Sequence, residues 1–165
     1  MNCLGPLLNP AGVQLQLLGC YDDGLVEPLA RVLGELGRRR ALVVHGSDGL
    51  DDLTTTGPSR AALLDHGRVE EIVVEPEALG IPLARLEDLA GGAPDENARL
   101  LRATLAGEEG PRRDVVTLNA GAALWVAEAA SSLAQGVEQA RESIDSGAAA
   151  EKLDALVRAT KAAAV

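Results

Sequence analysis

The chain has 165 residues and a formal net charge of −10, with one tryptophan, one tyrosine and no phenylalanine. This length predicts one domain of ordinary size, whose core must be built from aliphatic side chains. The acidic balance argues against general nucleic-acid binding, which needs a basic face, and no apolar run approaches the ~18 residues of a membrane span. The two cysteines, Cys3 and Cys20, lie far apart and no signal-like segment accompanies them, so we expect a cytoplasmic protein with unpaired thiols.

The first half of the chain predicts a strand, a helix, a second strand and a hairpin. These elements span residues 15–20, residue 22 or 23 to about 36, and residues 41–44, 59–64 and 68–74. The run 41–44 is wholly apolar and ends at polar, glycine-rich sequence, which is typical of a buried, parallel strand. The sequence Asp65-His66-Gly67 is a turn signal that joins the two hairpin strands. Together these elements indicate an α/β fold that contains a β-α-β unit.

The second half of the chain predicts helices. They span residues 94–106, 114–127, 135–144 and 148–160. The second of these helices is apolar nearly all round, so we expect it to lie deep in the fold and to leave Asn119 as a buried polar group that needs partners.

Two other segments carry structural expectations. Gly5-Pro6 and Asn9-Pro10 are turn sequences of the kind found inside a fold, and the residue before each proline should be extended. Arg38, Arg39 and Arg40 precede the buried strand, at the end of the sheet away from its expected ligand-binding edge. We therefore interpret the three arginines as a solvated link.

The segment that follows the buried strand carries the strongest chemical signal. Open α/β sheets bind ligands beyond the carboxyl ends of their strands, and here the strand is followed by His45 and a glycine-punctuated acidic loop. Adjacent carboxylates at Asp51 and Asp52 can share a hard cation such as Mg²⁺, which takes oxygen ligands and keeps several waters. The alternative is that these aspartates are solvated turn residues. We interpret His45 as a structural hydrogen-bonding residue, and the sequence of this segment does not identify a catalytic acid or base.

The order of several segments resembles anthranilate phosphoribosyltransferase. They are LGPLLNPAG, QLLGCY, the long segment that ends in VHGSDGLDDLTTTGPS, RDVVTLNAGAAL and IDSGAA. The resemblance implies a nucleoside phosphorylase-like α/β fold with a mixed sheet flanked by helices, of which this chain would form the second half. Residues 1–12 would be a remnant of the segment that joins a small helical domain, and residues 13–165 the C-terminal part of the large α/β domain.

The resemblance also implies an activity and site residues. The family transfers the phosphoribosyl group of phosphoribosyl pyrophosphate to the amino group of anthranilate in tryptophan biosynthesis. Asp51 and Asp52 would bind Mg²⁺ that holds the pyrophosphate, with Asp52 replacing the usual glutamate by a side chain one methylene shorter. Gly5 and Pro6 would shape the path of anthranilate.

The family's glycine-rich GTGGD sequence and the helices that form its homodimer interface have no counterpart in this sequence. We therefore expect the C-terminal half of the enzyme, from a truncated gene, a split gene or a misplaced start, with the upstream half needed for turnover. The alternatives are a non-catalytic remnant and a related nucleoside phosphorylase-like protein.

Overall fold

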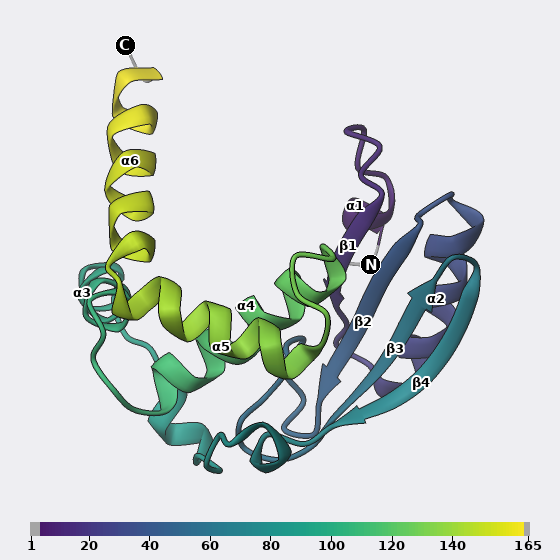
Figure 1. The fold of residues 1–165 in the computed structure, drawn as a ribbon, viewed down its shortest axis with the longest axis horizontal. Coiled ribbons are helices and arrows are strands. Elements are labelled where there is room, and N and C mark those ends of the chain that lie inside the picture. The colour runs from purple at the N-terminus through teal and green to yellow at the C-terminus, as the bar shows by residue number, and fades with distance from the viewer. Residues whose placement is uncertain (1–3, 164–165) are drawn as a thin grey trace.

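The computed structural model describes residues 4–163, which form a four-stranded sheet and six helices (Figure 1). The strands are β1 (Leu15–Gly19), β2 (Arg40–Gly46), β3 (Ser59–Asp65) and β4 (Arg68–Val74), and the helices are α1 (Leu4–Leu7), α2 (Val26–Glu35), α3 (Pro94–Leu105), α4 (Pro111–Val126), α5 (Leu133–Asp145) and α6 (Ala148–Ala163). Short 3₁₀ turns lie at η1 (Asp23–Leu25), η2 (Glu77–Leu79) and η3 (Leu86–Leu89). None of the helices in residues 4–163 has the length and apolar character that a membrane span needs.

The sheet is mixed, with the strand order β1-β2-β3-β4. β1 and β2 run parallel and are joined through α2, whereas β2, β3 and β4 pair antiparallel. His66 and Gly67 form the two-residue turn of the hairpin with φ angles of 47° and 84°, as such a turn requires. The mixed sheet flanked by helices confirms the predicted α/β class, the parallel pair and the hairpin.

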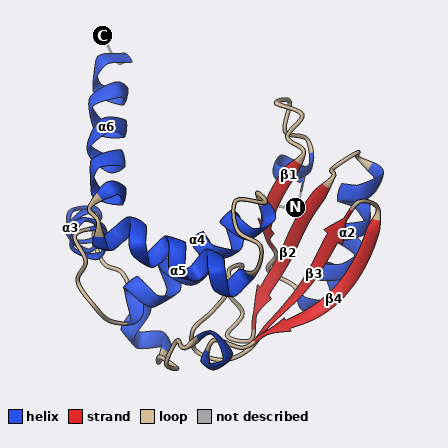
Figure 2. Cartoon of the chain, viewed as in Figure 1, coloured by secondary structure: helices blue, strands red, loops and turns tan. Residues whose placement is uncertain are grey.

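The two faces of the sheet pack against different helices (Figure 2). On one face Val43 of β2 packs with α2 residues such as Leu33, and on the other Leu42 and Val44 pack with Leu118 of α4. Because both faces of β2 are covered, its residues on either face are apolar, which explains the continuous run in the sequence.

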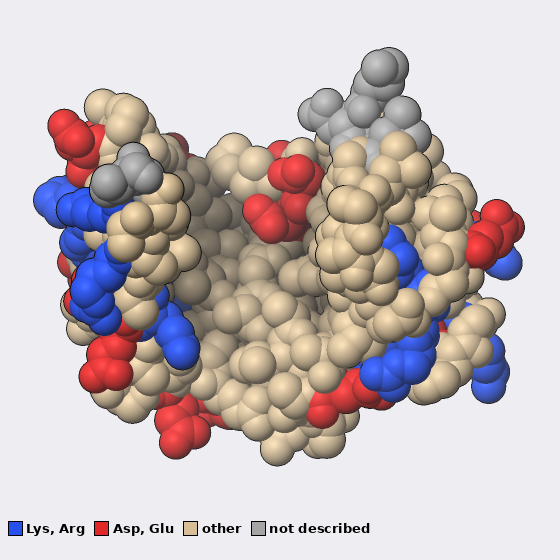
Figure 3. Space-filling view, turned by 90° about the horizontal axis from the view of Figure 1, so that it is seen from above, with Lys and Arg blue, Asp and Glu red and all other residues tan. Residues whose placement is uncertain are grey.

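Of the C-terminal helices, α4 packs on the sheet, whereas α6 extends away from it (Figure 1). α4 and α5 pack very closely, since a Cβ on Gly136 would lie 2.2 Å from the backbone oxygen of Gly121. α6 has no buried residue, and Leu156 on it is 60% exposed. α6 and the N-terminal elements lie on opposite sides of the molecule in Figure 1, and Figure 3 shows the surface hollowed between them.

Three sequence expectations were wrong in detail. α4 begins at Pro111, three residues before the predicted start, because proline fits the first turn of a helix. Gly5 precedes a proline but is helical, and proline is tolerated there because first-turn N–H groups have no helical acceptor. The third concerns the arginines.

Arg38 is buried and Arg40 is partly buried, so neither belongs to a solvated link. Arg38 is 8% exposed, and its Nε donates to Oε1 of Gln16 at 3.2 Å. The Arg40 guanidinium lies 5.4 Å from the ring centroid of Trp125, and the Arg40 side chain is 13% exposed. The middle arginine of the three remains exposed.

Candidate metal and pyrophosphate site

The acidic loop spans residues 47–58, between the end of β2 and the start of β3. It therefore lies at the carboxyl end of the parallel pair β1 and β2, where the sequence predicted it. Asp51 and Asp52 are both exposed on this loop. The Leu50 carbonyl before them accepts a hydrogen bond from the Gly46 N–H at 2.9 Å, and the Leu53 backbone after them is hydrogen-bonded to Asn119.

Asp48 organises the loop from within. Its carboxylate accepts hydrogen bonds from the hydroxyls of Thr54 at 2.5 Å and Thr56 at 2.9 Å, and from the Leu50 N–H at 3.1 Å. Partial burial alone would raise the pKa of Asp48. The hydrogen bonds from Thr54, the Leu50 backbone and Thr56 outweigh this effect and hold the pKa below its ordinary value. The Asp48 carboxylate thus stabilises the conformation of the loop.

Gly19, the last residue of β1, sets how closely the loop approaches the sheet. A Cβ on Gly19 would lie 1.7 Å from the backbone oxygen of Asp51, far inside any allowed contact. The Asp51 backbone can rest against the end of β1 because this position has no side chain.

Asn119 of α4 holds the loop on the other side of the acidic pair. Its Oδ1 accepts from the Leu53 N–H at 3.0 Å, and its Nδ2 donates to the Leu53 carbonyl at 2.8 Å and to the Val115 carbonyl at 3.0 Å. The partners that the sequence required for Asn119 therefore belong to the residue directly after Asp52.

The electrostatics of the pair suit a cation. Partial desolvation of its carboxylate raises the pKa of Asp52, and the negative charges of Asp51 and Asp48 raise it further. A divalent cation would relieve this repulsion between carboxylates. Within residues 4–163 no group of three or more His, Cys, Asp or Glu side chains is arranged to hold a metal. Two carboxylates nevertheless fit Mg²⁺, which is usually bound by one or two carboxylates together with waters and substrate phosphates.

Gly5 and Pro6 lie outside the acidic loop. They belong to α1, and the Pro6 carbonyl accepts a hydrogen bond from Nε2 of Gln16 at 3.2 Å. Gln16 lies near the amino end of β1, whereas the acidic loop contacts Gly19 at the carboxyl end. The described fold therefore does not bring Gly5 and Pro6 together with the aspartates.

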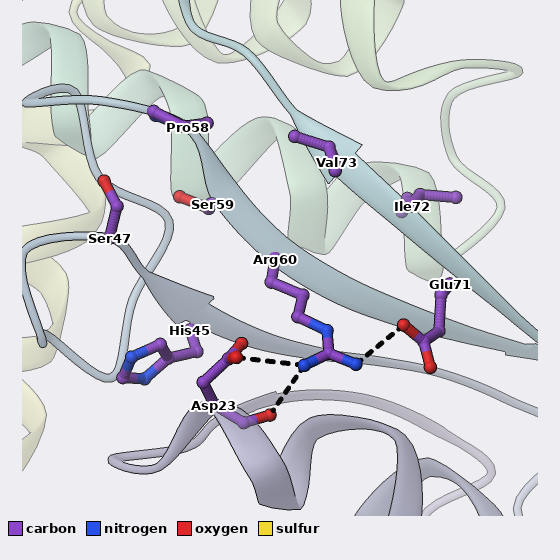
Figure 4. A pocket seen from close by; sticks show the side chains of 9 residues that line it. All are labelled: Asp23, His45, Ser47, Pro58, Ser59, Arg60, Glu71, Ile72 and Val73. Carbon is purple, nitrogen blue, oxygen red and sulfur yellow. Dashed lines mark hydrogen bonds and ion pairs between the residues drawn. The ribbon is translucent and has the colours of Figure 1, made fainter.

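His45 makes the structural bond expected of it, with Nδ1 2.7 Å from the Cys20 carbonyl oxygen. It also lines an open cavity of about 540 Å³ on the face of the sheet that α2 covers (Figure 4). Arg60 crosses this cavity and pairs with Asp23 at 2.9 Å and Glu71 at 2.8 Å. Asp51 and Asp52 do not line it, although Ser47 and Pro58, the two ends of the acidic loop, do.

Sequence reasoning found the exposed acids but missed the residues that support them. Asp48 belongs to the same acidic stretch, and the only hint of its partners was the run Thr54-Thr55-Thr56, because hydroxyls can donate to a partly buried carboxylate. The role of Gly19 depends on a contact between β1 and a loop that follows β2, which no spacing within the loop reveals.

Comparison with known proteins places the chain among transferases. Residues 1–150 match the family model described as "Glycosyl transferase family, a/b domain". An anthranilate phosphoribosyltransferase of Moorella thermoacetica is 56% identical over 156 residues, which are 94% of this chain and 46% of that protein.

Solved structures agree. The anthranilate phosphoribosyltransferase of Thermus thermophilus superposes with a TM-score of 0.87 at 43% identity, over 95% of this chain and 46% of that one. The Saccharomyces cerevisiae enzyme in complex with PRPP and Mg superposes with a TM-score of 0.78 at 28% identity, over 92% and 44% of the two chains. The chain thus spans about half the length of the relatives it matches. It belongs to the glycosyl transferase family, a/b domain, and within it is similar to the anthranilate phosphoribosyltransferases.

Proposed function

We propose that the chain supplies the Mg²⁺-binding and pyrophosphate-binding part of a cytoplasmic anthranilate phosphoribosyltransferase of tryptophan biosynthesis. The observation that carries the proposal is the exposed pair Asp51 and Asp52 at the carboxyl end of β1 and β2. The loop that carries the pair is held by its contacts with Gly19 and Asn119. The reaction would move the phosphoribosyl group of phosphoribosyl pyrophosphate to the amino group of anthranilate.

In this proposal the residues of the chain bind and orient. Asp51 and Asp52 would hold Mg²⁺, which when bound neutralises the negative charge that develops on the departing pyrophosphate. Asp48 and Gly19 would keep the loop in one conformation, so that the carboxylates need no rearrangement when substrate arrives. Asp52 is shorter by one methylene than the family's usual glutamate, so its position depends more strongly on the loop backbone.

The remaining parts of the proposal rest on the resemblance. Gly5 and Pro6 would form an apolar wall for anthranilate, with shape as their contribution because neither has a side chain that can exchange a proton. Since the chain lacks a GTGGD sequence and spans about half of its relatives, we propose that a further polypeptide segment supplies the glycine-rich cradle. A chain of a split enzyme, or an assembly that resembles the family's homodimer, would satisfy this requirement.

The proposal is tested by metal binding to the 165-residue chain. Mn²⁺ replaces Mg²⁺, pyrophosphate is present, and free Mn²⁺ is measured by electron paramagnetic resonance. We expect D51N and D52N each to weaken Mn²⁺ binding by more than about tenfold. Loss of an outer-shell partner of a metal ligand already lowers metal affinity by about that factor, and loss of the ligand itself should lower it further. Asp154 is exposed on α6, and D154N serves as the control with one carboxylate removed elsewhere.

Equal Mn²⁺ affinity in the wild type, D51N and D52N would overturn the proposal, as would a loss of the same size in D154N. Circular dichroism of each variant shows whether the fold is kept.

A further inference from the structure

Asn119 connects a core helix to the backbone beside the acidic pair. It lies on α4, whose neighbouring residue Leu118 is fully buried against the sheet, so α4 is fixed relative to β2. Its amide makes a two-way contact with Leu53, accepting from the N–H and donating to the carbonyl of the same residue. The second Nδ2 hydrogen is used by the Val115 carbonyl. Two carbonyls and one N–H can be satisfied together in only one orientation of the amide.

The contact between Asn119 and Leu53 lies directly beside the acidic pair. Leu53 directly follows Asp52, and its side chain is fully buried. On the other side the Asp51 carbonyl rests against Gly19. The two carboxylates are therefore carried by a short stretch of backbone whose ends are fixed by β1 and by α4. A substitution of Asn119 that allowed the peptide unit between Asp52 and Leu53 to rotate would also change the direction of the Asp52 Cα–Cβ bond.

We propose that Asn119 is a positioning residue for the metal site, which sets the direction of the Asp52 carboxylate through the Leu53 backbone. The inference rests on the proposed function of the acidic pair. Asn119 touches neither metal nor substrate in this role. It acts as outer-shell partners of metal ligands do, by limiting the geometries that the ligand can adopt.

The chain offers a matched control for this residue. Asn97 of α3 makes the same two-way contact with the backbone of Gly92, where Oδ1 accepts from the N–H at 2.8 Å and Nδ2 donates to the carbonyl at 2.9 Å. N97A thus removes an equivalent amide clamp from a segment outside the acidic loop. N119S is a second test variant, because a serine hydroxyl can still donate to the Val115 carbonyl four residues earlier while losing Leu53.

The experiment measures two quantities on the 165-residue chain. Amide hydrogen exchange of Leu53, followed by nuclear magnetic resonance, reports the clamp without metal. Mn²⁺ affinity in the presence of pyrophosphate reports the site. In N119A and N119S we expect faster Leu53 exchange and Mn²⁺ affinity lower by about 10- to 100-fold, as for other outer-shell partners, with unchanged circular dichroism. N97A should change neither quantity.

The outcomes separate the two proposals. Faster Leu53 exchange with unchanged Mn²⁺ affinity would overturn the positioning role and leave the metal site standing. Absence of Mn²⁺ binding in the wild type would overturn the proposed function and, with it, this inference. If N119A does not fold, N119S decides, and an unchanged Mn²⁺ affinity in N119S overturns the inference.

Discussion

The three aspartates of the acidic loop have different tasks although they lie within five residues of sequence. Asp48 accepts three hydrogen bonds from the loop itself, whereas Asp51 and Asp52 are exposed. The sequence could predict the exposed pair, because adjacent acids after a buried strand have a small set of uses. It could not assign Asp48, because its partners meet only when the loop turns back on itself.

Replacement of Asp48 by asparagine should destabilise the fold in a pH-dependent way. The hydrogen bonds lower the pKa of Asp48 below its ordinary value of 3.8, so its ionised form stabilises the folded state above that pH. This contribution should disappear as the pH falls through the lower folded-state pKa. We expect D48N to reduce the free energy of unfolding at pH 7 by about 1 kcal/mol, a value reduced by solvent screening of a partly exposed carboxylate.

Urea denaturation of the wild type and D48N at pH 7 and near pH 3 measures this difference. The gap between the two proteins should narrow at the lower pH, and D154N should show little effect at either. A gap that stays constant or widens as the pH falls would contradict the assignment of Asp48.

At the scale of elements, the local pattern predicted what local interactions decide. The continuous apolar run of β2 and the His66-Gly67 turn follow from neighbouring residues, and both are confirmed. The burial of Arg38 and the partial burial of Arg40 were missed because their partners, Gln16 and Trp125, come from β1 and α4. Basic residues before a strand are usually solvated, and only the packed fold reveals the exception.

The contact between Arg40 and Trp125 gives a spectroscopic test of how α4 is docked on the sheet. Trp125 is the sole tryptophan of the chain, so its fluorescence reports this one position. We expect R40A to shift the emission maximum to longer wavelength, because the indole loses the side chain that covers it, and to destabilise the fold by about 1 kcal/mol through the lost cation–π contact.

R31A is the control, since Arg31 is an exposed residue of α2 that pairs with Glu27 of the same helix. It should leave the emission maximum unchanged. An unshifted spectrum in R40A would show that Arg40 does not cover the indole in solution.

At the scale of the whole molecule, the arrangement of the described residues leaves a strand edge and an exposed leucine without internal partners. β1 pairs with β2 along one edge, and residues 4–163 provide no strand for its other edge. The strand is LQLLG, an apolar sequence with a line of backbone donors and acceptors facing outward. The exposed Leu156 of α6 faces away from any buried core. The predicted domain division, residues 1–12 and 13–165, stays a prediction.

We therefore expect the 165-residue chain to self-associate, and to do so more strongly as salt is added. The net charge of −10 opposes contact between copies at low ionic strength, and salt screens that repulsion while apolar contacts persist. Sedimentation velocity at about 20 mM and 300 mM salt measures this self-association. Between these two concentrations the Debye length falls from above to below ~10 Å. The weight-average sedimentation coefficient should rise with both protein and salt concentration.

L156E adds charge to the exposed surface of α6 and should reduce the rise, whereas the exposed-surface control D154N should not. A single monomeric boundary at all concentrations and both salt levels would show that the free edge of β1 and the surface of α6 are protected in solution.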